Sequence, residues 1–172
     1  MRRSVGLAAR SAVGAACLLG LAILFGFGNW ASGSKYNPTL SVGDVAPDWK
    51  ALPGVDGKPH ALADYADQPV LVVVFTCHTC PTAVDYEDRL IALAKKLGQD
   101  KQGAVIAINS NKVADDELPG MRKRAALKSF PFAYLRDDTQ QVARAYGATV
   151  TPELFVLDQK RRVVYMGASL PA

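Results

Sequence analysis

The feature of this sequence that most constrains its fold is an apolar run followed at once by two closely spaced cysteines. Val70–Phe75 is six consecutive apolar residues, rich in β-branched side chains. Such a run is typical of a strand buried on both faces of a parallel sheet. Cys77 and Cys80 follow, and Pro81 suits the first position of a helix. The sequence therefore predicts a strand–CxxC–helix junction inside an α/β domain.

The residues after the cysteines continue the alternation of helices and strands. Apolar side chains at spacings of three and four predict a helix from Pro81 to about Gly98. Further strands are predicted over 104–108, 132–135, 153–157 and 162–166, and further helices over 119–128 and 138–146. Two short extended pieces, 49–52 and 59–61, flank a turn at Asp56-Gly57. The sum is a three-layer α/β sandwich on a mixed sheet, with parallel strands early and a hairpin at the end.

The N-terminal segment has the pattern of an export signal. Arg2, Arg3 and Arg10 precede a stretch from Ser11 to Ser34 that carries no charge. A basic region followed by an apolar one is the order of a secretory signal, and about 20 apolar residues also suffice to span a bilayer. We interpret 1–33 as a signal peptide or an N-terminal membrane anchor, with 11–28 as the anchoring stretch. Residues 34–41 are then a linker, and 42–172 form the domain.

Both interpretations of the N-terminus place the domain outside the cytoplasm, either periplasmic or membrane-anchored and facing the periplasm. The net charge of +4 comes largely from the basic N-terminus, because three of the 20 Lys and Arg lie in the first 31 residues, which contain no acid. The remainder is nearly balanced, so no nucleic-acid partner is expected. Three cysteines are too few for a domain held together by disulfides.

The CxxC spacing carries the chemistry. Two intervening residues let the sulfurs meet across the first helical turn, and the helix N-terminus favours a thiolate over a thiol. We predict that Cys77 is the exposed nucleophile and that Cys80 is the better shielded, resolving thiol. A cationic His78 would stabilise the thiolate, and Glu153 could accept a proton near the sulfurs. No metal ligand set is predicted, because only His60, His78 and Cys17 could complete a zinc site.

Four motifs resemble thioredoxin-fold proteins, most closely the extracytoplasmic redoxins of the alkyl hydroperoxide reductase/thiol-specific antioxidant group that carry a thioredoxin-type CxxC. They are GDVAPDW at 43–49, VVFTCHTCP at 73–81, YGATVTP at 146–152 and FVLD at 155–158. The resemblance covers residues 42 to 167. It implies a thioredoxin-like fold in which Thr151 and Pro152 form a cis peptide bond against the CxxC. The backbone of Thr151 would then pair with a substrate peptide bound at Cys77.

The function predicted from these features is extracytoplasmic thiol–disulfide exchange through a redox-active Cys77/Cys80 disulfide, without a cofactor. Its partners would be protein thiols or disulfides and an unidentified electron donor. A peroxiredoxin-like peroxidase acting through Cys77 is the first alternative. Against it, Val74 occupies the position where peroxiredoxins place a threonine or serine. A non-catalytic metal- or partner-binding module is the second alternative.

Two departures from the wider thioredoxin pattern accompany the resemblance. The strand region 69–76 contains no ionisable residue, whereas many thioredoxins bury an acid there to move the second proton. Only five residues follow Gly167, so the usual C-terminal helix is expected to be lacking. That absence would leave part of one sheet face without its usual cover.

Overall fold

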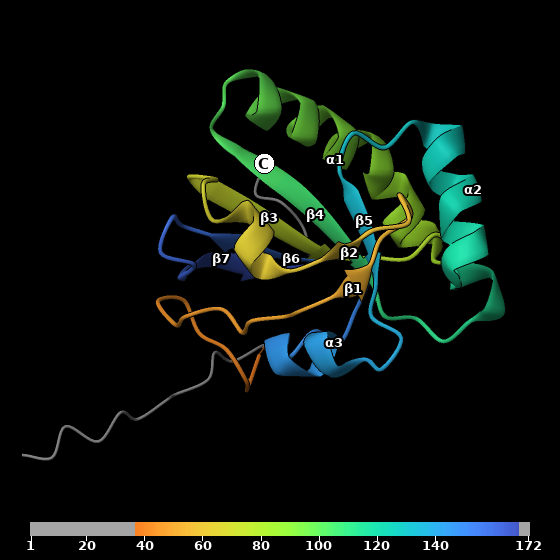
Figure 1. Cartoon of the computed structure of the whole chain (residues 1–172). Helices are drawn as coiled ribbons and strands as arrows, with labels where there is room; N and C mark the ends of the chain where they lie inside the picture. The colour runs from red at the N-terminus through yellow and green to blue at the C-terminus, as the bar shows by residue number, and fades with distance from the viewer. Residues whose placement is uncertain (1–36, 169–172) are drawn as a thin grey trace, which may run out of the picture. The chain divides into compact units, whose positions relative to one another are not determined.

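The computed structural model describes residues 37–168, and the predicted signal or anchor at 1–33 lies outside them (Figure 1). Five strands form one sheet in the order β5-β4-β3-β6-β7. They are β3 (Val70–Phe75), β4 (Gly103–Asn109), β5 (Ala133–Arg136), β6 (Glu153–Leu157) and β7 (Val163–Gly167). Strands β3, β4 and β5 are parallel, whereas β6 and β7 are antiparallel to their neighbours. This confirms the predicted mixed sheet with a closing hairpin.

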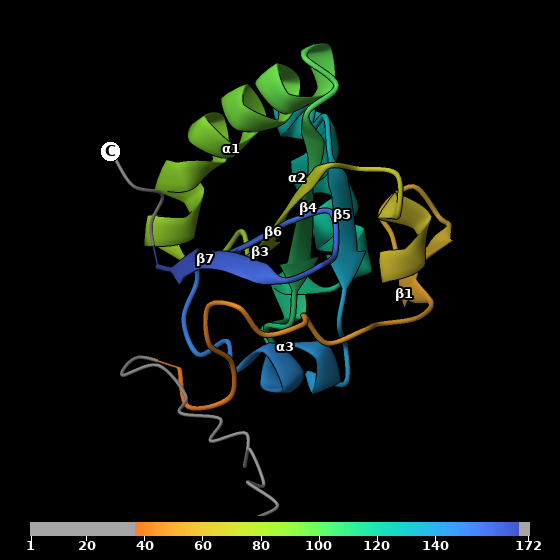
Figure 2. The ribbon, with the colours of Figure 1, turned by 90° about the vertical axis from the view of Figure 1, so that its left-hand side faces the viewer.

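Helices and an N-terminal segment cover the two faces of this sheet (Figure 2). Helices α1 (Pro81–Gln99) and α2 (Leu118–Lys128) contribute Leu90 and Met121 to the buried clusters of one face. The other face is covered by α3 (Gln141–Tyr146), the 3-10 turn η1 (Leu62–Tyr65) and the chain before it. That chain includes the small pair β1 (Leu52–Pro53) and β2 (Pro59–His60). The predicted thioredoxin-like three-layer sandwich is therefore confirmed.

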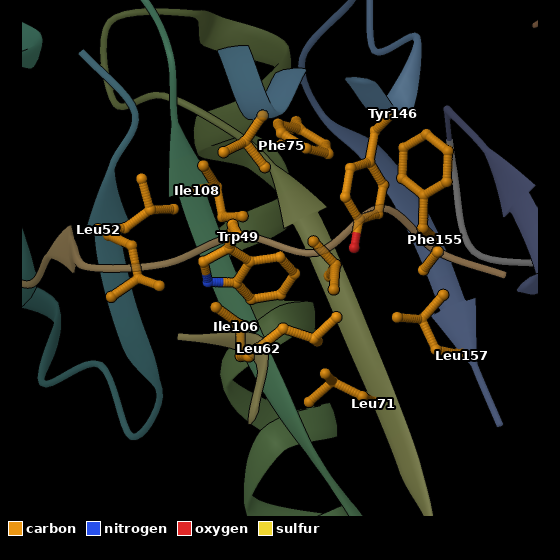
Figure 3. Close-up of a cluster of buried hydrophobic side chains, with 14 of the residues drawn as sticks. Trp49, Leu52, Leu62, Leu71, Phe75, Ile106, Ile108, Tyr146, Phe155 and Leu157 are labelled. Atoms are coloured by element: carbon orange, nitrogen blue, oxygen red, sulfur yellow. The ribbon is translucent and has the colours of Figure 1, made fainter. Parts of the chain in front are cut away.

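The larger core cluster lies between the sheet and this N-terminal cover (Figure 3). Because side chains alternate along β3, Phe75 faces this cluster, whereas Val74 faces α1. The ring of Tyr146 lies 5.4 Å from that of Phe75 and 5.2 Å from that of Phe155, measured between centroids. Trp49 is 3% exposed and packs into the same cluster. These aromatic side chains fix α3 and the N-terminal cover against the end of β3, where Phe75 stands two residues before Cys77.

Two boundaries differ from the sequence-based expectations. Helix α3 begins at Gln141 rather than at 138, because Gln140 has a left-handed backbone that cannot continue a helix. The side-chain carboxylate of Asp137 accepts a hydrogen bond from the backbone N–H of Ala143, near the start of α3. Part of the predicted linker 34–41 also packs on the domain, since the buried amide of Asn37 donates to the carbonyl of Tyr146 at 2.7 Å.

The described chain ends shortly after β7, and no helix follows that strand within residues 37–168. Over the same residues, no helix is both long and apolar enough to cross a bilayer.

Candidate functional site

The two cysteines lie where β3 leads into α1. Cys77 follows the buried end of the strand, and Cys80 is the residue that precedes the first turn of the helix. Cys80 has an extended backbone, so the loop ends at this residue. Pro81 begins the helix with a fixed φ and has no backbone N–H that needs a partner. Both thiols are free. The local sequence therefore forms the predicted strand–CxxC–helix junction.

Thr151 contacts both sulfurs. Its hydroxyl lies 3.4 Å from the Cys77 sulfur, and the Cys80 thiol donates to its carbonyl oxygen at 3.6 Å. The Thr151–Pro152 peptide bond is cis, the conformation that the resemblance implies. Glu153 follows and is only 8% exposed, with its carboxylate accepting the N–H groups of Thr149 and Val150. Glu153 thus closes the loop that carries Thr151.

The structure reverses the predicted exposure of the two cysteines. Cys77 is 3% exposed, whereas Cys80 is half-buried. The reason is where the helix starts. Cys80 precedes its first residue and does not sit one turn inside, while Cys77 still lies at the strand end beside Thr151. The prediction that Cys77 is the outer sulfur is therefore wrong.

The surroundings of Cys80 favour the ionised form of its thiol. Its sulfur makes no regular capping hydrogen bond with the helix. Nevertheless, the backbone N–H of Ala83, and after it the Thr151 side chain, lower the pKa of the Cys80 thiol against the opposing effect of burial. Cys80 thus combines partial exposure with a lowered pKa, which suits a reactive thiolate.

His78 turns toward a buried acid that the sequence analysis did not single out. Its Nδ1 lies 2.9 Å from Oδ1 of Asp116, which belongs to the 3-10 turn η2 (Ala114–Asp116) and is fully buried. The hydroxyl of Tyr134 lies 3.5 Å from the same ring nitrogen. Burial raises the pKa of this tyrosine. His78 is therefore bound within a polar cluster on the α2 side of the loop.

Asp116 accepts hydrogen bonds from both residues between the cysteines. The N–H of His78 donates at 3.0 Å and the hydroxyl of Thr79 at 2.5 Å. The side-chain amides of Asn109 and Asn111 donate at 3.2 and 2.7 Å. Burial alone would raise the pKa of Asp116, but these bonds, together with the charge of His78, outweigh it and lower that pKa.

One signal in the sequence could have located this acid. Asn109 is the last residue of β4, and further polar residues follow from Ser110; β4 is parallel to β3. Because the carboxyl ends of parallel strands meet at one edge of a sheet, residues after β4 lie near those after β3. Position on the sheet, rather than a motif, therefore points to Asp116.

A cleft of about 430 Å³ opens beside the cysteines. Both sulfur-bearing residues line it, together with hydroxyl and amide side chains such as those of Ser110, Asn111 and Gln140. Its lining includes no lysine, arginine, aspartate or glutamate. Because uncharged polar and apolar side chains line it, the cleft suits an uncharged segment that brings a sulfur to the pair. Across residues 37–168, no group of three His, Cys, Asp or Glu side chains is placed to hold a metal ion.

Residues 42–166 match the AhpC/TSA family. The chain belongs to the AhpC/TSA family. This confirms the resemblance drawn from the four motifs and makes the protein a thioredoxin-fold redoxin. No curated protein shows significant similarity to the chain.

Solved structures of similar proteins extend the comparison. An uncharacterized conserved protein from Geobacillus kaustophilus is 34% identical to this chain, with a TM-score of 0.71. The match covers 76% of this chain and 70% of the Geobacillus chain. A hypothetical protein from Sinorhizobium meliloti is 35% identical, also with a TM-score of 0.71, covering 76% and 72%. A putative thiol:disulfide interchange protein DsbE from Chlorobium tepidum is 26% identical, with a TM-score of 0.63, covering 74% and 84%. Of these three similar structures, the one from Chlorobium tepidum is described as a putative thiol:disulfide interchange protein.

Proposed function

We propose that this AhpC/TSA protein is a thiol–disulfide oxidoreductase that uses a Cys77/Cys80 redox-active disulfide. The observation that carries the proposal is that both free thiols contact Thr151 at the edge of a cleft. The lowered pKa of Cys80 supports it, because a thiolate is the nucleophile in disulfide exchange. The similarity to a structure described as a disulfide interchange protein points the same way.

The reaction proceeds in two exchange steps. One cysteine attacks a substrate disulfide as a thiolate, forms a mixed disulfide and expels one substrate thiolate, which takes up a proton. The second cysteine then attacks the first sulfur and releases the other substrate thiol. The substrate gains two electrons and two protons in all, and the protein is left with a Cys77–Cys80 bridge. An external electron donor must reduce that bridge before the next turnover.

Insulin reduction in the presence of a small dithiol tests this proposal. We expect the reduced full chain to precipitate insulin, and Cys77→Ser and Cys80→Ser each to abolish turnover. The resolving-cysteine variant should instead accumulate mixed disulfides that mass spectrometry detects. Cys17→Ser is the matched control, because it removes the third cysteine of the chain and should retain activity. Full activity in both Cys77→Ser and Cys80→Ser would overturn the proposal.

Peroxide reduction is a second candidate, favoured by the hydroxyl of Thr151 at 3.4 Å from the Cys77 sulfur. A thiolate there would take one oxygen from a peroxide, release an alcohol or water, and become a sulfenate, which takes up a proton to give the sulfenic acid. The other thiol would condense with it to a disulfide and release water. Stopped-flow mixing with hydrogen peroxide tests this candidate. Oxidation no faster than that of free cysteine would dismiss it.

The proposed site of action is outside the cytoplasm, with protein thiols or disulfides as substrates. This rests on the uncharged stretch after Arg10, which lies outside the described residues. A fusion of the whole chain to a reporter enzyme that is active only after export tests it. Export is expected from the intact sequence and should fail when residues 11–28 are deleted. Equal export without that stretch would contradict the assignment.

A further inference from the structure

We infer that the cleft beside the cysteines selects an uncharged peptide segment of the substrate, whose N–H groups donate to the side-chain oxygens of Asn111 and Gln140. The cleft disfavours disulfides that carry carboxylates next to the sulfur. The inference rests on the proposed function and names the class of substrate that the same site takes. It adds two specificity-determining residues to the loop of Thr151.

The cleft is built around the end of β3. Strands β4 and β6 lie on opposite sides of β3, so the segment after β4 and the loop before β6 flank the strand end that leads to the cysteines. Residues of both segments line the cleft. Its apolar lining comes from the sheet, from α3 and from the loop after α3, namely Phe75, Ile108, Ala143, Ala148 and Val150. The volume of about 430 Å³ lies within the range of roughly 300–1,000 Å³ that is usual for ligand sites, so the cleft holds more than a single sulfur.

The two amide side chains that line the cleft use their donors inside the protein. The amide nitrogen of Asn111 donates to Oδ2 of Asp116 at 2.7 Å and to the hydroxyl of Thr79 at 3.3 Å. The amide nitrogen of Gln140 donates to the carbonyl oxygen of Ser110 at 2.9 Å. Because an ionised carboxylate and a carbonyl oxygen only accept hydrogen bonds, these partners fix which end of each amide is the nitrogen. The oxygens of both amides are therefore at the other end.

The cleft thus has acceptors to offer and no charge to pair. Among residues 37–168, the side-chain oxygen of Asn111 has no hydrogen-bond partner, and that of Gln140 accepts only from Arg144, at 3.5 Å. A peptide N–H is the donor that satisfies such an oxygen without bringing a charge. The lining includes no lysine, arginine, aspartate or glutamate. A charged group that enters the cleft would lose its water without gaining a counter-ion.

Single-turnover reduction of peptide disulfides by the reduced full chain tests the inference. The probes are disulfide-linked dimers of the blocked tripeptides Ala-Cys-Ala, Asp-Cys-Asp and Lys-Cys-Lys, and of Ala-Cys-Ala with methylated backbone nitrogens. Each rate is divided by the rate at which dithiothreitol reduces the same probe, which removes the probe's own reactivity. We expect the alanine probe to react about tenfold or more faster than the aspartate probe, and about threefold or more faster than its methylated form. The lysine probe should be no faster than the alanine probe.

Gln140→Lys tests whether the cleft itself makes this selection. The new side chain can still donate to the carbonyl oxygen of Ser110, but it brings a cation to the cleft and removes an acceptor. The differences that separate the alanine probe from the aspartate and methylated probes should both shrink, by about threefold for the aspartate probe. Gln141→Lys is the matched control, because Gln141 is the next residue, is exposed and does not line the cleft. It should keep both differences.

Thr149→Lys keeps the inference testable if Gln140→Lys does not fold. Thr149 lines the cleft and is exposed, and its backbone N–H, which donates to Glu153, is kept by the substitution. The aspartate probe should again gain on the alanine probe. Equal normalised rates for the alanine and aspartate probes would overturn the inference. So would a lysine probe faster than the alanine probe, a methylated probe as fast as its parent, selection unchanged in both cleft variants, or an equal shift in Gln141→Lys.

Bis(2-hydroxyethyl) disulfide separates this inference from the proposed function, because it is a small uncharged disulfide without peptide N–H groups. A chain that reduces it but treats all the peptide probes alike retains the proposed function and loses the selection by the cleft. A chain that reduces neither this compound nor any probe loses the proposed function, and the inference that rests on it falls as well.

Discussion

At the scale of single residues, Asp116 shows how partners decide whether a buried charge destabilises or stabilises a fold. An ionised carboxylate removed from water loses several kcal/mol of solvation unless donors replace the water. Here the donors are His78, Thr79 and two asparagine amides. They outweigh the effect of burial and leave the pKa of Asp116 below its ordinary value. The folded state therefore binds the charged form of this residue more tightly than the neutral form.

This lowered pKa makes a prediction about stability and pH. A carboxyl group with a lower pKa in the folded state stabilises the fold above its unfolded value of about 4, and the contribution is lost as the pH falls through the folded pKa. Asp116→Asn should lower the free energy of unfolding at neutral pH by about 1–3 kcal/mol. The difference should shrink in strong acid. Urea unfolding at both pH values measures it, and an equal difference at both would contradict this account.

At the scale of elements, the sequence predicted the helices and strands that can be recognised from the pattern of their own residues. The apolar run of β3 and the periodicity of α1 reflect burial and needed no tertiary information. The start of α3 could not be predicted in this way, because it depends on the left-handed Gln140 and on a side-chain bond from Asp137. The exposure order of the cysteines depends likewise on how the loop of Thr151 covers Cys77.

Gly120 lies where η2 and α2 approach each other, and replacing it tests how close that approach must be. A Cβ at this position would clash with the backbone carbonyl of Asp115, which cannot move without displacing the turn that carries Asp116. Gly120→Ala should therefore lower the free energy of unfolding, measured by urea unfolding, despite the better helix propensity of alanine. Gly98→Ala is the matched control, because it lies in α1 with open space around its Cβ and should stabilise by about 0.5–1 kcal/mol. Equal changes in the free energy of unfolding for Gly120→Ala and Gly98→Ala would contradict the close approach of η2 and α2.

At the scale of the whole molecule, the four motifs were enough to indicate the family and the three layers. They located Cys77, Cys80 and Thr151, which the fold brings together. They did not locate Asp116, because three consecutive acids, 115–117, are typical of a solvated loop unless the ends of β3 and β4 are known to adjoin. They also did not show that the domain includes Asn37, whose role depends on Tyr146, far along the chain.

Asn37 tests how the N-terminal cover is fastened to the rest of the domain. Its amide nitrogen donates to the carbonyl of Tyr146, and its oxygen accepts the N–H groups of Thr39 and Leu40. Asn37→Ala leaves these buried groups without partners and should lower the free energy of unfolding by about 1–3 kcal/mol. Thr39→Ala is the matched control, since Thr39 is exposed and keeps its backbone N–H. Chemical unfolding followed by tryptophan fluorescence measures both, and equal stability of the two variants would contradict the assignment.

The most direct test of the central claim is the redox equilibrium of the cysteine pair. The full chain is equilibrated in a series of thiol–disulfide buffers, its free thiols are trapped, and mass spectrometry then locates any bridge. The account predicts that Cys77 and Cys80 convert together, by two electrons, between free thiols and one intramolecular disulfide, with a single defined reduction potential. A pair that stays free in every buffer, or that forms disulfides only with Cys17 or with other molecules, would contradict it.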